Sequence, residues 1–291
     1  MEPSQLSPEQ FNEFRKLIYK LSGIYVPENR ITLLSNRIRR RLRALQLPAY
    51  TDYLLLLKTH AGAEELSLFL DAVTTNETSF FRTEKQFHWL QNDFLSDLSS
   101  RIQRGSHPRK LRIWSAACSS GQEPLTIGIC LLEQSELLRG VDIEIDATDL
   151  SEQVLAQARS AQYEQRLLAG IPEELQQKYF QTVPRAANAA TDSDPSKQLF
   201  QVRTPLRKLI NYKRHNLIEK PPGKDYDCIF LRNVMIYFDN QSKQVVAKHL
   251  QNALADGGYL VVGPAEGLHE QVQNLHRHSA FIYQKTSGAR S

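Results

Sequence analysis

The sequence predicts an α/β protein in which a small all-helical domain precedes a mainly parallel, doubly wound sheet. Residues 1–75 show only helical apolar spacing, and after about residue 86 strand patterns alternate with helical ones. In the stretch 111–132 an apolar strand ends in small residues and a helix follows. A strand, a small-residue turn and a helix in this order form the ligand-binding crevice of an open α/β sheet.

Length and composition place the chain among ordinary globular proteins. Its 291 residues suffice for two modest domains, and 41% of them are hydrophobic and 23% charged. No apolar run approaches the roughly 20 residues that span a bilayer, so we expect no membrane insertion. Three widely spaced cysteines, Cys118, Cys130 and Cys228, and a polar N-terminus indicate reduced thiols and a cytoplasmic protein. The net charge of +4 is mild, so the location of the cations matters more than their number.

The first predicted domain is helical and covers residues 1–85 with its linker. Apolar spacing predicts helices at 8–22, 32–45, 50–60 and 63–73. On a helical wheel of the second helix, four arginines lie away from the apolar stripe and toward solvent: Arg37, Arg39, Arg40 and Arg43.

The second predicted domain covers residues 86–291. Helices are expected at 87–104, 124–138, 151–160 and 242–255, and strands at 111–117, 141–148, 227–232, 259–263 and 280–284. The region within about 163–214 breaks this alternation, and we expect a small antiparallel β insert there. The insert contains a polar, small-residue loop at 184–197.

Acidic residues follow the first two predicted strands of the sheet. Glu123 stands at the helix start, where a dinucleotide site would present bare N–H groups to a pyrophosphate. A carboxylate there repels phosphate and attracts a cation, which favours S-adenosylmethionine, a nucleoside cofactor with positive charge and no phosphate. Asp149 ends the second strand, where an acid accepts hydrogen bonds from ribose hydroxyls. The alternative for both acids is stabilisation of a helix N-terminus.

Two further polar segments lie at positions where ligands bind. Asn233 and Tyr237 follow the strand 228–231, at the carboxyl edge of the sheet, although they could simply cap a turn. The segment 74–82, TTNETSFFR, joins the two predicted domains and combines polar residues with paired aromatics. A helix-capping role for Thr75 or Asn76 is the alternative, and the residues alone do not decide.

Five segments in this order, TTNETSFFR, WSAACSSGQEP, ATDLS, HNLI and LRNVMIYFD, closely resemble the chemotaxis receptor glutamate methyltransferases, the CheR family. The resemblance implies a Rossmann-like S-adenosylmethionine-dependent methyltransferase sheet with an antiparallel β-subdomain, preceded by a small all-α domain. It implies that nine residues contact S-adenosyl-L-methionine and its product S-adenosyl-L-homocysteine: Asn76, Thr78, Arg82, Glu123, Asp149, Asn216, Leu217, Asn233 and Val234. By the same matching, Arg82 and Tyr237 lie nearest the transferred methyl group.

The implied reaction is methylation of glutamate side chains in methyl-accepting chemotaxis or related sensory proteins, for sensory adaptation. A glutamate with an ordinary pKa of about 4.3 is already ionised near neutral pH, so no strong general base is required. Alignment and desolvation of the carboxylate would supply the catalysis, with Arg82 orienting it and Tyr237 donating a hydrogen bond. The four arginines of the second helix would dock an acidic face of the receptor helix, or form an ordinary solvated face.

Two other functions fit parts of the sequence. A non-catalytic S-adenosylmethionine-binding module that docks on a receptor array would keep Glu123 and Asp149 but could dispense with Arg82 and Tyr237, whose presence favours an enzyme. RNA methylation ranks last, because the basic helix lacks interleaved stacking aromatics. We expect a monomeric cytoplasmic enzyme that reaches receptor arrays transiently, with no metal and no nucleic-acid partner.

Overall fold

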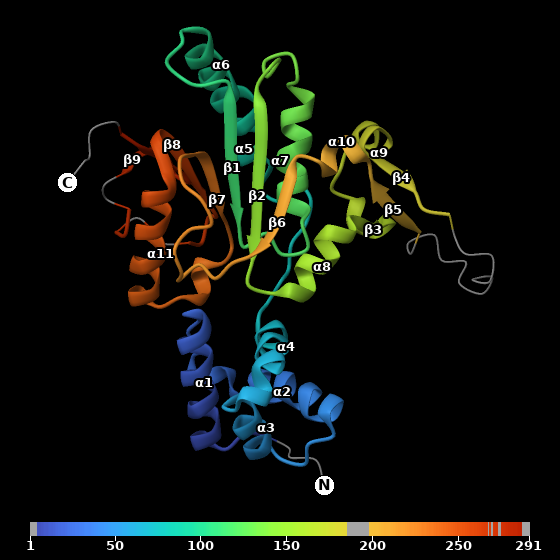
Figure 1. Cartoon of the computed structure of the whole chain (residues 1–291), viewed down its shortest axis with the longest axis vertical. Helices are drawn as coiled ribbons and strands as arrows, with labels where there is room; N and C mark the ends of the chain where they lie inside the picture. The colour runs from blue at the N-terminus through green and yellow to red at the C-terminus, as the bar shows by residue number, and fades with distance from the viewer. Residues whose placement is uncertain (1–4, 185–197, 267, 269, 273–274, 287–291) are drawn as a thin grey trace.

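The computed structural model describes residues 5–184, 198–266, 268, 270–272 and 275–286. A helical N-terminal part stands beneath an α/β part, and a small sheet extends to one side (Figure 1). The α/β class, the mainly parallel sheet, the antiparallel insert and the all-helical first part are therefore confirmed. The polar loop predicted at 184–197 lies, apart from Pro184, outside the described residues. No helix in the described part of the chain has the length and apolar content to cross a bilayer.

The N-terminal part consists of α1 (Pro8–Ser22), α2 (Ile31–Leu45), α3 (Tyr50–Leu57) and α4 (Ala63–Val73). Ser7 begins α1 with a capping box, because its hydroxyl accepts the N–H of Gln10. The core of this part contains the rings of Phe14, Tyr53 and Phe69, whose centroids are 5.9–6.2 Å apart. These helices have an apolar cluster of their own, and Ile24 packs against both this cluster and the one on the second face of the sheet.

Seven strands form the main sheet in the order β6-β2-β1-β7-β8-β10-β9. Their bounds are β1 (Lys110–Ala116), β2 (Asp142–Asp149), β6 (Ile210–Arg214), β7 (Tyr226–Leu231), β8 (Leu254–Val262), β9 (Leu275–Ser279) and β10 (Ile282–Lys285). The first five strands in the order are parallel, and β10 and β9 add antiparallel pairs. The chain leaves β1 toward β2 on one side and returns to β7 on the other, so the topological switch lies between β1 and β7.

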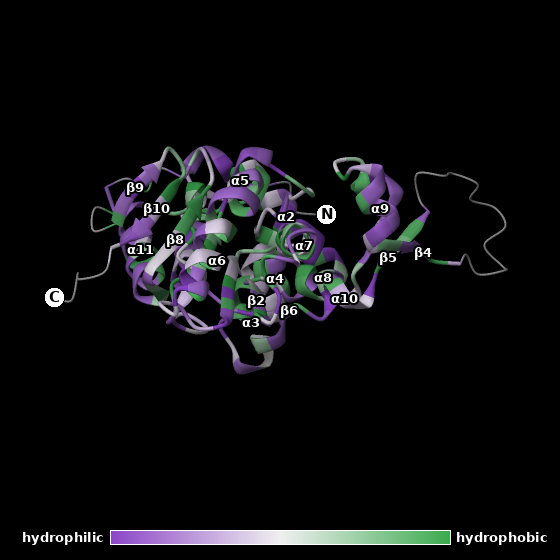
Figure 2. Cartoon of the chain, turned by 90° about the horizontal axis from the view of Figure 1, so that it is seen from above, coloured by the Kyte–Doolittle hydropathy of each residue, from purple (hydrophilic) through white to green (hydrophobic). Residues whose placement is uncertain are grey.

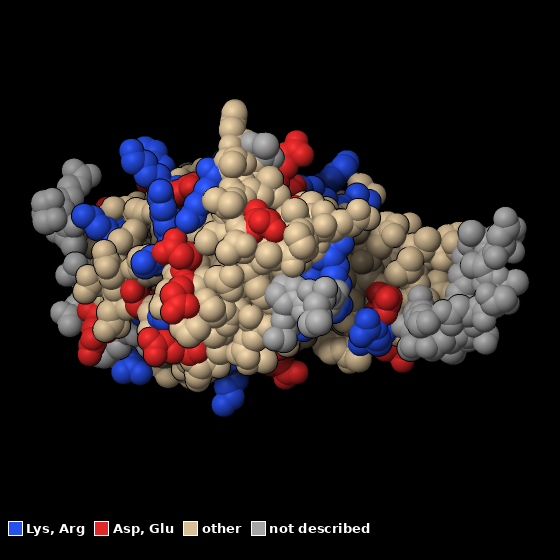
Figure 3. All heavy atoms as spheres, turned by 90° about the horizontal axis from the view of Figure 1, so that it is seen from below, with Lys and Arg blue, Asp and Glu red and all other residues tan. Residues whose placement is uncertain are grey.

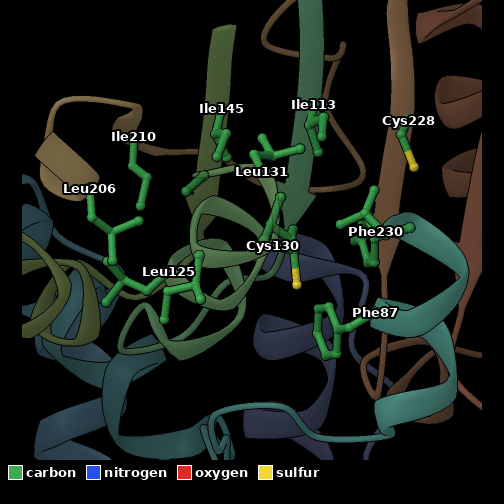
Figure 4. Packing of buried hydrophobic residues seen from close by; sticks show 14 of the residues in the cluster. Phe87, Ile113, Leu125, Cys130, Leu131, Ile145, Leu206, Ile210, Cys228 and Phe230 are labelled. Atoms are coloured by element: carbon green, nitrogen blue, oxygen red, sulfur yellow. The ribbon is translucent and has the colours of Figure 1, made fainter. Parts of the chain in front are cut away.

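Helices cover both faces of this sheet. The first face is covered by α5 (Glu84–Trp89), a π-helical turn (Leu90–Phe94), α6 (Leu95–Gln103) and α7 (Gln122–Glu133), and α8 (Glu152–Ser160) packs near β6 and β2. Leu125 and Leu131 of α7 pack with Ile113 and Ile145 of the central strands (Figure 4). On the second face, α11 (Asn240–Ala253) packs its apolar side near Trp114. Hydrophobic strands thus lie between helices with polar outer surfaces (Figure 2).

The small sheet has the antiparallel order β3-β5-β4. It contains β3 (Gln162–Glu164), β4 (Phe180–Thr182) and β5 (Leu199–Val202), with α9 (Glu173–Tyr179) and α10 (Thr204–Arg207) beside it. The insert predicted within 163–214 needs a correction at its end, because residues 210–214 form β6 and pair in parallel with β2 of the main sheet. The strand β9 was not predicted, since its sequence LHRHS is polar, as an exposed edge strand tolerates.

Candidate functional site

One cavity lies at the carboxyl ends of β1, β2 and β7, beside the topological switch. Its lining comes from these strand ends, from the linker after α4, from the segment after β6 and from the C-terminal end of α1. All ten residues predicted to bind the cofactor or act in catalysis line it: Asn76, Thr78, Arg82, Glu123, Asp149, Asn216, Leu217, Asn233, Val234 and Tyr237. The fold therefore brings together residues from five separate segments of the chain.

The turn after β1 follows a path that favours small residues. Ala117, Ser119 and Gly121 have φ of +61°, +51° and +93°. A Cβ on Gly121 would lie 2.8 Å from the Tyr212 hydroxyl, so a larger residue there would push against the side chain of this half-buried tyrosine. Gly121 also ends the turn, and α7 begins at Gln122, two residues earlier than predicted. Glu123 consequently occupies the second position of the helix.

Asp149 is buried at the end of β2 and is oriented by the backbone. Its two carboxylate oxygens accept the N–H groups of Ser119 at 2.8 Å and Ser151 at 3.0 Å. Burial raises the pKa of Asp149, and these hydrogen bonds oppose the rise. A carboxylate has about four acceptor sites, so the group can still accept hydrogen bonds from a ligand in the cavity.

The sequence predicts an isolated negative charge at Glu123, but in the structure its carboxylate has two side-chain partners. Its Oε1 accepts the hydroxyl of Ser115 at 2.7 Å, and its Oε2 lies 3.0 Å from Nη1 of Arg232. The side chains of Glu123 and Arg232 are 12% and 2% exposed. Arg232 also donates to the carbonyl of Arg82 and lies over the ring of Phe87.

Arg232 was missed by the sequence analysis, although it stands within the segment LRNVMIYFD. The available signal was a charged residue at the end of an otherwise apolar strand, a position where burial requires a partner. Its pairing with Glu123 neutralises part of the negative charge at the helix start. The cavity thus contains a fixed ion pair together with the buried carboxylate of Asp149.

The linker TTNETSFFR has an apolar anchor and a polar side. The ring of Phe80 makes edge-to-face contacts with Tyr163 and Phe180, at centroid distances of 5.2 and 5.7 Å. On the polar side, the carbonyl of Asn76 accepts the hydroxyl of Ser119 at 2.7 Å. Nη1 of Arg82 donates to the carbonyl of Glu77 at 3.0 Å, and the Arg82 side chain stays exposed. The paired aromatics therefore fix the linker so that its polar residues line the cavity.

The N-terminal part forms one wall of the cavity. The Asn216 amide donates to the carbonyl of Leu21 at 2.7 Å, and Tyr25 donates its N–H to the carbonyl of Tyr237 at 2.8 Å. An antiparallel bridge between Ile24 and Phe238 continues this contact. The side chain of Asn216 therefore joins the two parts of the protein as well as lining the cavity.

Two of the four arginines of α2 are less exposed than the sequence predicts. Arg40 and Arg43 are exposed, as predicted, but Arg37 and Arg39 are half-buried. Arg37 donates to the hydroxyl of Thr75 at 2.8 Å and to the carbonyl of Val73, and burial lowers its pKa. The prediction that all four side chains point to solvent is therefore wrong for Arg37 and Arg39, and Arg37 is covered because the linker packs against α2. On the face seen from the N-terminal side, cations and acids are interspersed (Figure 3).

The donor set of the cavity fits S-adenosylmethionine. Asp149 offers buried acceptors for hydroxyl groups, Glu123 offers a carboxylate beside the turn, and Arg82 offers a cation for a carboxylate. Apolar side chains such as Ile24 and Leu217 provide a surface for an aromatic base.

Comparisons with known proteins agree with this chemistry. A family model described as "CheR methyltransferase, SAM binding domain" matches residues 76–283, and one described as "CheR methyltransferase, all-alpha domain" matches residues 9–74. The chain is 33% identical to a chemotaxis protein methyltransferase of Borreliella burgdorferi over 264 residues, which cover 90% of this chain and 89% of that protein.

Two further relatives carry similar descriptions. A chemotaxis protein methyltransferase 2 of Pseudomonas aeruginosa is 35% identical over 265 residues, covering 89% of this chain and 86% of that protein. A chemotaxis protein methyltransferase of Salmonella typhimurium is 31% identical over 281 residues, covering 96% and 90%. The similarity therefore extends over both the helical and the α/β parts.

Proposed function

Because the chain belongs to the CheR methyltransferase family, we propose that it methylates glutamate side chains of methyl-accepting chemoreceptors or related sensory proteins. It is an S-adenosylmethionine-dependent methyltransferase, and the proposed product on the receptor is a glutamyl methyl ester. The observation that carries the proposal is that Arg82 and Tyr237 line the same cavity as Asp149 and Glu123. A non-catalytic module would have no need of that combination.

The proposed reaction does not require a strong general base from the protein. When bound, S-adenosylmethionine supplies a methyl group activated by a sulfonium centre. Transfer forms a carbon–oxygen bond at the glutamate carboxylate and breaks the carbon–sulfur bond, so no proton has to leave the acceptor. Asp149 and Glu123 would fix the cofactor, Arg82 would orient the acceptor carboxylate, and Tyr237 would donate a hydrogen bond to it.

A second groove beside the cavity supports an approach route for the acceptor. It shares Ile24, Val73, Thr75 and Tyr237 with the cofactor cavity and adds exposed apolar side chains and two cations: Tyr25, Leu33, Ile236, Arg30 and Arg37. Apolar and cationic groups together complement a helix that carries both apolar residues and glutamates. We propose that Arg37, Arg39, Arg40 and Arg43 dock such a helix, with the half-buried Arg37 also positioning the linker.

The cavity and the groove also bear on the oligomeric state and the location of the enzyme. The enzyme acts as a monomer in the cytoplasm and associates transiently with receptor arrays, because one chain supplies both the cofactor cavity and the acceptor groove. Electrostatic attraction between the four arginines of α2 and an acidic receptor helix would raise the rate at which enzyme and receptor meet more than it raises their affinity.

Replacing Arg82 by alanine should lower kcat/KM for methyl transfer by about 100-fold, the usual cost of removing a group that orients or stabilises the reacting atoms. The measurement is transfer of labelled methyl from S-adenosylmethionine to a membrane fraction rich in the organism's receptors. Lys85→Ala is the matched control, since Lys85 is an exposed cation three residues away that does not line the cavity. Equal rates for Arg82→Ala and wild type would remove Arg82 from the proposed mechanism.

A further inference from the structure

A buried carboxylate lies behind the cofactor cavity and was not among the predicted site residues. Glu266 follows β8 and is fully buried. Its Oε1 accepts the N–H of Val234 at 3.2 Å, and its Oε2 accepts the N–H of Met235 at 2.7 Å. In the described part of the chain, its side-chain hydrogen bonds go to this one turn. The turn lies after β7, and its residues Asn233 and Val234 line the cavity.

The turn has a conformation that requires support. Asn233 has φ of +59°, in the left-handed region that non-glycine residues adopt at a cost. Consecutive N–H groups in such a turn converge on one side and attract an anion. The carboxylate of Glu266 accepts two of these N–H groups and does not itself line the cavity.

The packing around Glu266 leaves little freedom to the carboxylate. A Cβ on Gly263 would lie 2.9 Å from Oε1 of Glu266 and 3.2 Å from the backbone nitrogen of Asn233. Gly263 therefore allows β8, the carboxylate and the turn to approach closely. Burial raises the pKa of Glu266 to about 7, while the N–H groups of residues 233–235 and the charge of Lys243 oppose the rise.

We propose that Glu266 is a positioning residue for the cofactor site, which fixes the turn at 233–235 so that Asn233 and Val234 face the cofactor. It contacts neither the cavity nor the acceptor groove, so it acts through the backbone of the turn. The proposal concerns cofactor binding alone and does not depend on which protein is methylated.

The test is the affinity for S-adenosylmethionine of Glu266→Gln, measured by calorimetry well below the melting temperature. Glutamine keeps the volume but replaces one acceptor oxygen by an NH₂ group, which then faces a backbone N–H. We expect the Kd to rise about tenfold, with KM for the cofactor rising and KM for the acceptor unchanged. A purely structural role would lower the melting temperature and leave both constants unchanged.

Asp227→Asn is the matched control. Asp227 is a buried carboxylate that accepts a backbone N–H, from Arg112 at 2.8 Å, but it lies at the opposite end of β7. This variant should lose stability and keep its cofactor affinity. Gly263→Ala perturbs the same contact from the side of β8, because its Cβ would press on both the carboxylate and the backbone of Asn233, and it too should weaken cofactor binding. Unchanged affinity in Glu266→Gln, or an equal loss in Asp227→Asn, would overturn the proposal.

Discussion

The variant Asp149→Asn should bind S-adenosylmethionine about 100-fold more weakly than the wild type. Asp149 is the proposed acceptor for the ribose hydroxyls, and each hydrogen bond to a charged group contributes about 1.5–3 kcal/mol. Asparagine also turns an NH₂ group toward either the N–H of Ser119 or that of Ser151, which disturbs the orientation of the side chain. Isothermal titration with cofactor and with S-adenosylhomocysteine measures the effect directly.

The control for this experiment is Asp146→Asn in the same strand. Asp146 is even more buried than Asp149, but it accepts hydrogen bonds from the hydroxyl of Tyr226 and the ammonium of Lys213 and does not line the cavity. Its replacement should lower the melting temperature and preserve the cofactor affinity. If Asp149→Asn bound the cofactor normally, the assignment of the ribose site to the end of β2 would be wrong.

The second large effect is expected on stability, from Glu65→Ala in the N-terminal part. Glu65 is buried and accepts two hydrogen bonds from Arg41, at 2.8 and 2.7 Å, and one from the Tyr53 hydroxyl at 2.6 Å. Removing one partner of a fully buried ion pair costs about 3–5 kcal/mol, and because the Arg41 side chain is 21% exposed, the cost here should lie at the lower end, about 3 kcal/mol. The free energy of unfolding, measured by denaturant titration, should fall by that amount.

The neighbouring Glu64→Ala provides the comparison for Glu65→Ala. Glu64 is exposed on the same helix turn, so its loss should change stability by less than about 0.5 kcal/mol. Equal stability of the two variants would show that the Arg41–Glu65–Tyr53 cluster does not stabilise the domain.

Local sequence patterns predicted the parts of the site that local structure determines. The small residues after β1 and the acids Glu123 and Asp149 stand where a strand ends and a helix begins, and that position follows from periodicity alone. The linker aromatics could be recognised as unusual, but their packing against Tyr163 and Phe180 depends on a distant insert.

Contacts between distant segments could not be predicted in this way. The pairing of Glu123 with Arg232 requires the register of β1 with β7, in which Ala116 lies opposite Leu231. A helical wheel gives the direction of Arg37 relative to the apolar stripe of α2, but it does not show that the linker covers this side. Residues 210–214 have a polar strand pattern that fits either an insert or the edge of a sheet. Only their parallel pairing with β2 shows that they belong to the main sheet.

The most direct test of the proposed reaction is the identity of the methylated atom. Purified enzyme, labelled S-adenosylmethionine and a receptor signalling fragment should yield methyl groups that mild alkali releases and that mass spectrometry places on glutamates of the receptor helix. Substituting those glutamates by glutamine should abolish the label, and Arg82→Ala should nearly abolish it. Alkali-stable label, or no label on a receptor with free glutamates although the enzyme binds the cofactor, would contradict the assignment as a protein-glutamate methyltransferase.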